Sequence, residues 1–324
     1  MLGNLYYGTL HTAGITTLAR RLRQGALVLC YHNVVPRPDH LPPFGEPGLH
    51  LPVDRFTAQV HWLKDHYTVV SLRELVDRLE NGRPVRGLAA ITFDDGYAGA
   101  FTFAWPLLRA LDLPATMFIV GRAPDRPAVF WWDHPVVRNG TPPDDRDHRL
   151  FALSGDRAVI LRDASAGAVA DGPVPSTHLP ADWSVVAREA AAGLDLGAHT
   201  MTHRTLTQLG ETDLAQEIAR SRDVIEERTG WRPKFFSYPY GIWDGRVHQA
   251  VRRAGYRGAV TLDYGLNTAG IDTCMLRRVN VPAFISSPAF AGWAAGIRPR
   301  SSAHSPNPRL ESLEIPSPQT SVGR

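Results

Sequence analysis

The sequence predicts a parallel α/β fold in which strands and helices alternate along the chain. Short apolar runs bounded by turn residues are typical of buried parallel strands. Seven such runs lie near residues 26–30, 88–93, 115–120, 194–198, 234–238, 258–262 and 276–281. The segments between them have helical periodicity, and this alternation indicates a parallel sheet with helices on its faces.

The chain before the first strand, residues 1–24, is interpreted as a helical extension. Its apolar residues are interrupted by polar residues and glycine before Arg20, Arg21 and Arg23, which predicts neither a signal peptide nor a membrane span. An amphipathic helix that packs on the domain is one interpretation, and a helix that rests on a membrane surface is the other. We therefore expect a cytoplasmic protein, with peripheral membrane contact as the second choice.

The second strand, near 88–93, runs directly into Asp94, Asp95 and Gly96. Two adjacent carboxylates at the end of a buried strand need a cation or a proton. A loop in which one Asp caps a following helix is the simpler interpretation. A metal or acid/base site requires partners elsewhere in the chain.

The third strand is followed by a long excursion from the repeating pattern, residues 122–180, with the aromatic cluster Phe130-Trp131-Trp132 near its start. Long excursions of this kind typically bind substrate or cover a groove. Trp131 and Trp132 are candidate sugar platforms because aromatic faces stack on the apolar faces of sugars. Packing in the core explains them equally well.

The fourth strand, near 194–198, leads into His199 and His203. If residues 199–203 begin a helical turn, both imidazoles lie on one face and can bind one ion. Together with the Asp-Asp turn they indicate a His-His-Asp metal site with an open position for water. Such N and O ligands suit Zn²⁺ first, with Co²⁺, Ni²⁺, Fe²⁺ or Mn²⁺ as alternatives. The helical stripe Leu214, Ile218, Ser221 and Ile225 follows, and Gly230 ends it.

The fifth strand, near 234–238, ends in Tyr238-Pro239-Tyr240-Gly241. One interpretation is a strand end with a packed aromatic wall. The other is a substrate wall containing Tyr238 and Pro239, in which the backbone N–H of Tyr240 helps to hold an oxyanion.

These three strand-end segments, in this order and spacing, resemble the polysaccharide deacetylase family, also called the NodB-homology family or carbohydrate esterase family 4. The similarity covers roughly residues 26–282. The matching motifs are Thr92-Phe93-Asp94-Asp95-Gly96, His199-Thr200-Met201-Thr202-His203 and Tyr238-Pro239-Tyr240-Gly241. The resemblance implies a single domain over residues 25–298 with a distorted (β/α)7 barrel. It also implies that Asp94 is the catalytic base, that Asp95, His199 and His203 are the metal ligands, and that Tyr240 supplies the oxyanion-hole amide.

The sequence departs from the family pattern at two positions. Ser237 stands where many members have an arginine that pairs with the catalytic aspartate, and the last strand lacks the Leu-x-His signature that supplies the general acid. The first strand of a barrel neighbours the last, so we hypothesise that His32 is the general acid. His134 and His248 are the alternatives.

The resemblance implies a metal-dependent hydrolase that removes N-acetyl groups from an amino sugar, in a polysaccharide, an oligosaccharide or a lipid-linked glycan precursor. A metal suits this chemistry because it lowers the pKa of bound water toward about 7. One alternative is a related amidohydrolase acting on a formamido sugar or a small amide. Another is a non-catalytic glycan-binding protein that kept the metal, although such a protein has no need of the unliganded Asp94.

The composition is consistent with this assignment. The 324 residues are 44% hydrophobic and 21% charged, so one large core can form. The net charge of +3, from 35 basic and 32 acidic residues, gives no argument for nucleic-acid binding. Two cysteines do not make a disulfide framework. Residues 299–324, rich in proline and serine, are expected to be a disordered tail.

Overall fold

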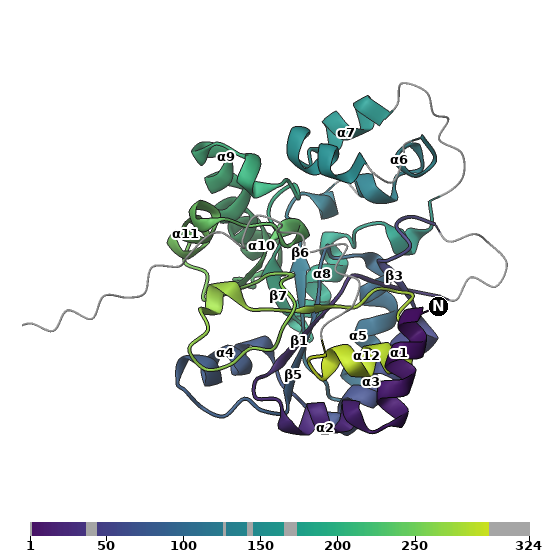
Figure 1. The fold of residues 1–324 in the computed structure, drawn as a ribbon. Helices are drawn as coiled ribbons and strands as arrows, with labels where there is room; N and C mark the ends of the chain where they lie inside the picture. Colours follow the sequence, from purple (N-terminus) through teal and green to yellow (C-terminus); the bar gives the residue numbers. More distant parts are fainter. Residues whose placement is uncertain (1, 37–43, 126–127, 141–144, 165–173, 298–324) are drawn as a thin grey trace, which may run out of the picture.

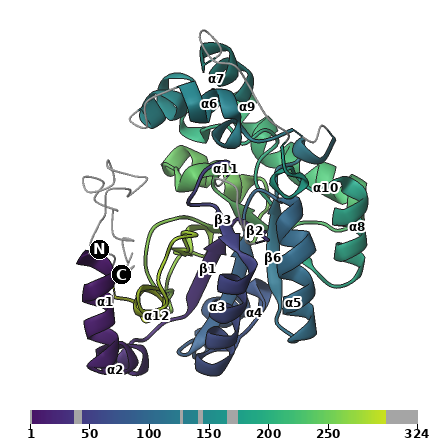
Figure 2. The same cartoon turned by 90° about the vertical axis from the view of Figure 1, so that its right-hand side faces the viewer.

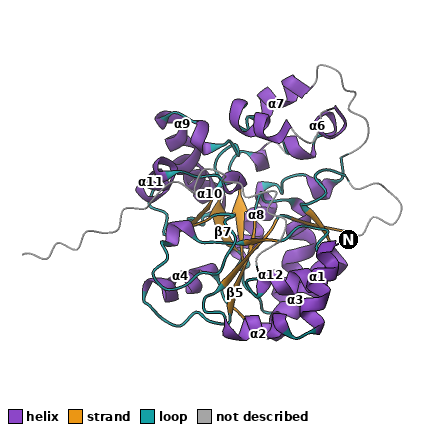
Figure 3. Ribbon diagram, in the orientation of Figure 1, coloured by secondary structure: helices purple, strands orange, loops and turns teal. Residues whose placement is uncertain are grey.

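The computed structural model describes residues 2–36, 44–125, 128–140, 145–164 and 174–297. Its centre is a parallel sheet enclosed by helices (Figure 3). The strand order is β10-β1-β5-β6-β7-β8-β9, and β4 (Thr68–Val69) pairs with β5 outside this row. The strands of the row are β1 (Leu27–Tyr31), β5 (Leu88–Phe93), β6 (Ala115–Ile119), β7 (Asp195–Ala198), β8 (Phe235–Ser237), β9 (Gly258–Val260) and β10 (Val279–Asn280).

The sheet curls so that its two ends approach each other. An isolated parallel bridge joins Val260, at the end of β9, to Leu276, which precedes β10. At the other end of the row, β1 pairs with β10 in the register Leu29↔Val279. The distorted (β/α)7 barrel is therefore confirmed, as is the expectation that its first and last strands are neighbours. A short second sheet pairs β2 (Asn33–Val35) with β3 (His50–Pro52).

Helices surround the sheet and bury their apolar stripes against it (Figure 1). In α3, Phe56, Val60 and Leu63 are buried, and the predicted stripe from Leu214 to Ile225 is buried as well. The helices around the barrel are α3 (Val53–His66), α4 (Leu72–Glu80), α5 (Trp105–Ala110), α8 (Trp183–Ala191), α9 (Glu211–Ala215), α10 (Ser221–Thr229), α11 (Gly245–Arg253) and α12 (Ser287–Ala294). One π-helical turn, Gln216–Arg220, joins α9 to α10. Gly230 ends α10 in the left-handed conformation, with φ 70°, as a helix C-cap glycine does.

The described part of the excursion after β6 includes the helices α6 (Pro135–Gly140) and α7 (Arg157–Ala164). Figure 1 shows them at one end of the molecule, opposite to α2 (Ile15–Leu22). The first helix, α1 (Leu2–Thr12), lies beside α12 (Figure 2), where the rings of Tyr7 and Trp293 are 6.5 Å apart.

None of the helices in the described ranges is long and apolar enough to cross a bilayer. The expected tail, residues 299–324, lies outside the described part of the chain, and the cytoplasmic location stays a prediction.

Candidate active site

The carboxyl ends of the parallel strands bring the predicted site residues together. Asp94 follows β5, His199 follows β7, and His32 follows β1. The hydrogen bonding of the sheet continues for one residue past β5 and β7. Asp94 N donates to the Tyr31 carbonyl and His199 N to the Ile119 carbonyl, each at 2.9 Å. The side chains of Asp94 and His199 are almost fully buried.

Asp95, His199 and His203 form a compact trio of ligand atoms. Asp95 Oδ1 lies 3.5 Å from His199 Nε2 and 3.3 Å from His203 Nε2, and the two Nε2 atoms are 3.0 Å apart. All three side chains are buried. Each contributes one atom to a group that could hold a metal ion.

The chemistry of this donor set fits a divalent metal. The Nδ1–H of His199 donates to the Ser237 carbonyl at 2.7 Å, which leaves Nε2 as the ring nitrogen that faces the other two ligand atoms. Burial raises the pKa of Asp95, but the hydrogen bonds from both histidines outweigh it and hold that pKa well below its usual range. Two imidazoles and an ionised carboxylate converge without a bulky fourth group, which is the pattern of an open zinc site.

The turn that carries the two histidines is not helical, so the helical turn considered from their spacing does not form. Thr200 and His203 both adopt left-handed backbone conformations, with φ 64° and 61°. The turn is held instead by side chains: Thr200 Oγ1 accepts from His203 N, and the Glu217 carboxylate accepts from the N–H groups of Met201 and Thr202, all at 2.9 Å. These bonds bring both imidazoles to one point without a helix, and Glu217 is a positioning residue that the sequence did not reveal.

Asp94 is fixed by Arg278, which immediately precedes β10. Arg278 donates from Nη1 to Asp94 Oδ1 at 2.8 Å and from Nη2 to Oδ2 at 2.6 Å, and the Ser237 hydroxyl donates to Oδ2 at 3.1 Å. Burial raises the pKa of Asp94, but the guanidinium outweighs it and lowers that pKa to about 2. The orienting arginine that is missing at position 237 is thus replaced from another strand.

One feature of the sequence indicates this role of Arg278. Arg277 and Arg278 interrupt the apolar residues of the predicted last strand, and Arg278 is fully buried in the structure. A charged residue in a buried strand needs a partner of opposite charge.

His32 lies at the site, beside Asp94. One ligand atom from each of Cys30, His32 and Asp94 lies within 4.8 Å of the others. Burial lowers the pKa of His32, and the nearby carboxylates of Asp95 and Asp94 partly offset that effect.

The two alternatives to His32 have other surroundings. His248 pairs through Nε2 with the Asp272 carboxylate at 3.0 Å. His134 Nδ1 accepts from the backbone N–H of Val136 at 3.3 Å. Neither bond joins its histidine to the Asp94 site.

The predicted sugar platforms are largely buried, which favours the packing interpretation. Trp131 and Trp132 are 6% and 8% exposed. Their indole N–H groups donate to the hydroxyls of Tyr240 and Tyr97, and the Trp132 ring packs on that of His203 with centroids 4.7 Å apart. Both residues therefore support the site wall and present no free face for a sugar to stack on.

The turn after β8 also forms part of the wall of the site. Tyr238 is fully buried and donates its hydroxyl to the Cys274 carbonyl at 3.0 Å, and Pro239 is also buried. Their burial favours the interpretation of a packed aromatic wall over contact with substrate. Tyr240 is half-buried and adopts a left-handed conformation with φ 58°, and its hydroxyl donates to the His203 carbonyl at 3.1 Å. That bond joins this turn to the histidine turn.

The curled parallel sheet, with an Asp-Asp turn and a His-x-x-x-His turn at its strand ends, agrees with the family that the motifs resemble. The family model described as polysaccharide deacetylase matches residues 81–259, more than half of the chain, and the chain therefore belongs to that family. Its predicted enzyme class, an N-deacetylase, is confirmed.

Two curated relatives agree with this assignment. YxkH of Bacillus subtilis, whose name places it among polysaccharide deacetylases, is 22% identical over 78% of this chain and 72% of its own length. The poly-beta-1,6-N-acetyl-D-glucosamine N-deacetylase of Escherichia coli K12 is 24% identical over 65% of this chain, but only 30% of its own length is matched.

Solved structures support the fold. The deacetylase PplD of Streptococcus pyogenes, in complex with acetate, superposes with a TM-score of 0.57 at 18% identity, covering 85% of this chain and 99% of that one. IcaB from Ammonifex degensii superposes with a TM-score of 0.58 at 20% identity, covering 85% of this chain and 98% of that one.

Proposed function

We propose that this enzyme is a metal-dependent hydrolase that removes N-acetyl groups from an amino sugar within a polysaccharide, an oligosaccharide or a lipid-linked glycan precursor. One observation carries the proposal: the buried trio of Asp95, His199 and His203 stands beside a second carboxylate, Asp94, which pairs with Arg278 and whose Oδ2 lies 4.0 Å from His199 Nε2. Two adjacent aspartates thus have different partners, as a metal ligand and a base require.

We assign the metal to Asp95, His199 and His203, with Zn²⁺ first because of the N₂O donor set. When bound there, a divalent ion polarises an acyl carbonyl and makes water more acidic. The chain itself positions the other groups. Asp94 stays ionised because Arg278 holds its pKa to about 2, and its fixed carboxylate accepts the proton of the attacking water.

The backbone N–H of Tyr240 is proposed to hold the oxyanion that forms on the acyl carbon. The left-handed conformation of Tyr240 and the hydroxyl bond to the His203 carbonyl fix this residue beside the metal trio. A preorganised donor of this kind stabilises charge that appears only in the transition state.

His32 is proposed to protonate the leaving amine. An imidazole is suited to proton transfer near neutral pH, and His32 lies beside Asp94. Its pKa is lowered by burial, so the protonated acid is lost as the pH rises. We expect His32→Ala to retain the metal and lose turnover. Full turnover with an unchanged pH profile in that variant would exclude the role.

The aspartate pair provides a matched test of the whole proposal. Metal content and acetate release from an N-acetylglucosamine oligomer are measured for the unmodified chain, Asp94→Asn, Asp95→Asn and the exposed control Asp65→Asn. We expect Asp94→Asn to keep the metal without turnover, Asp95→Asn to lose both, and Asp65→Asn to keep both.

The two alternatives are distinguished by the same assay. Release of formate from formylated sugars, without acetate release, would indicate the related amidohydrolase. Bound metal with no release from any acylated sugar would reject the enzymatic proposal and leave glycan binding.

A further inference from the structure

Helix α2 turns its apolar side toward solvent. Ile15, Leu18 and Leu22 are 45%, 55% and 65% exposed. Their spacing of three and four residues places them along one face of the helix. Thr16 is the buried residue of α2, so the helix packs a polar side chain inward and presents its leucines outward.

Positive charge gathers around this stripe. Arg20 and Arg21 lie in the last turn of α2, Arg23 follows it, and Arg86 donates to the Arg21 carbonyl. The sequence contains no acidic residue before Asp39. Among the residues that the structure describes, no carboxylate forms an ion pair with these four arginines.

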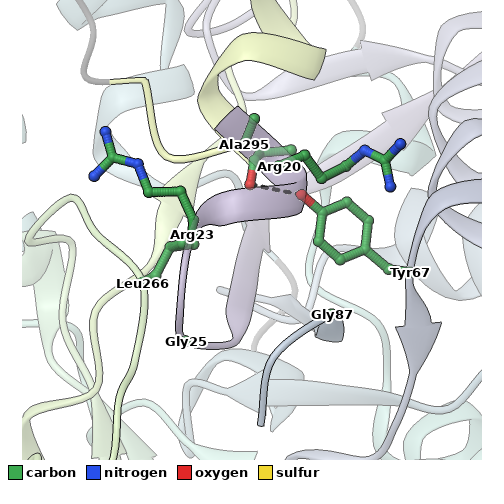
Figure 4. A pocket seen from close by; sticks show the side chains of 8 residues that line it. Arg20, Arg23, Gly25, Tyr67, Gly87, Leu266 and Ala295 are labelled. Carbon is green, nitrogen blue, oxygen red and sulfur yellow. Dashed lines mark hydrogen bonds between the residues drawn. The ribbon is translucent and has the colours of Figure 1, made fainter. Parts of the chain in front are cut away.

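A small hollow at the base of α2 separates two of the arginines. Figure 4 shows Arg20 and Arg23 on opposite sides of it, with their guanidinium groups directed away from each other. Arg20 donates to the His66 carbonyl at 3.2 Å, and Tyr67 closes the hollow by donating to the Ala294 carbonyl at 2.8 Å. The two guanidinium groups therefore lie on different sides of this hollow.

We propose that α2 docks the enzyme on an anionic phospholipid bilayer, with the stripe of Ile15, Leu18 and Leu22 in the interface and the arginines on the headgroups. An apolar stripe alone would suit many partners. The surrounding acid-free cluster of arginines selects a negatively charged surface, and a helix of eight residues lies on a bilayer without crossing it.

Docking through α2 would direct the candidate active site away from the bilayer. Helix α2 ends just before the amino end of β1, whereas the site residues follow the carboxyl ends of the strands. Figure 1 shows α2 and the excursion helices α6 and α7 at opposite ends of the molecule. This consequence rests on the proposed function, and it favours a glycan chain reached from the solvent side over a lipid-linked precursor.

The test is co-sedimentation of the full chain with phosphatidylcholine vesicles, with and without phosphatidylglycerol, at low and high salt. We expect binding only to vesicles that contain phosphatidylglycerol. Arg21→Gln/Arg23→Gln should weaken it about thirty-fold, and Leu18→Ser/Leu22→Ser about tenfold or more. The matched control is Phe284→Ser, because Phe284 is 70% exposed elsewhere and its loss should leave binding unchanged.

Equal binding to neutral and anionic vesicles, or no binding at all, would overturn the proposal. So would a dimer in solution that depends on Leu18 and Leu22 while vesicles are not bound. Because sedimentation needs no turnover, its failure leaves the proposed function standing. Acetate release from a soluble oligomer should not change when vesicles are added, and inhibition by vesicles would contradict the orientation.

Discussion

Replacing Arg278 tests how the fold holds Asp94. In Arg278→Met the apolar stem is kept, while the guanidinium and its five hydrogen bonds, to Asp94, Ser237, Thr92 and the Thr261 carbonyl, are lost. Asp94 remains buried and loses the guanidinium that pairs with it. Removing one partner of a buried ion pair costs about 3–5 kcal/mol, so we expect a loss of that size in the free energy of unfolding at neutral pH.

The sign of the pH dependence follows from the pKa of Asp94. In the unmodified chain this pKa is about 2, below the ordinary 3.8, so the ion pair stabilises the fold above pH 3.8 and is lost as the pH falls toward 2. In Arg278→Met the guanidinium no longer opposes burial and only the effects of His199 and His32 remain, so the pKa of Asp94 rises. The ionised carboxylate then destabilises the fold at neutral pH, and the difference between the two proteins should shrink in acid.

Urea unfolding at neutral and acidic pH measures this difference, and the pH profile of acetate release should show its acidic limb moved to higher pH. Arg278→Lys is the control that keeps the positive charge without the planar guanidinium. Its free energy of unfolding should lie between those of the unmodified chain and Arg278→Met. Adding Asp94→Asn to Arg278→Met should recover part of the lost stability. An equal loss at both pH values, with no recovery in the double variant, would refute this account of the pair.

Three further changes have defined outcomes. Burial, and after it the neighbouring His50, lowers the pKa of His178 to about 4, so between pH 6.5 and 4 the unfolded chain binds a proton that the folded chain excludes. The free energy of unfolding should therefore fall by about 1–2 kcal/mol as the pH drops through that window. Urea unfolding of His178→Gln should show a smaller fall. In Gly197→Ala the new Cβ would lie 2.3 Å from Phe118 Cδ1 on the adjacent strand, so a thermal melt should show a loss of about 1–3 kcal/mol in stability. In the control Gly245→Ala the new Cβ meets open space, and stability should not change. Adding Zn²⁺ to chelator-treated protein should raise the melting temperature of the unmodified chain and of Asp94→Asn. At a thousandfold excess of Zn²⁺ over Kd, the added stability is about 4 kcal/mol. An equal rise in Asp95→Asn would remove Asp95 from the ligand set.

The sequence by itself determined the strands and the residues that follow them. Burial on both faces requires continuous apolar runs, and those runs marked the strands of the barrel row to within a few residues. The polar residues that follow β5 and β7 are local signals as well, because a continuous apolar run that stops at carboxylates or imidazoles marks the end of a buried strand. Asp95, His199 and His203 could therefore be placed together from the sequence, since the ends of parallel strands meet at one edge.

Only the tertiary structure decided which side chains complete that edge. Arg278 and Asp94 are 184 residues apart, and they meet because β10 and β5 both flank β1, an order that no local pattern encodes. The histidine turn is set by Glu217 and by two left-handed residues, whereas spacing alone suggested a helix. Aromatic residues look the same in sequence whether they face sugar or core, and the burial of Trp131, Trp132 and Tyr238 became visible only once the excursion had packed over the site.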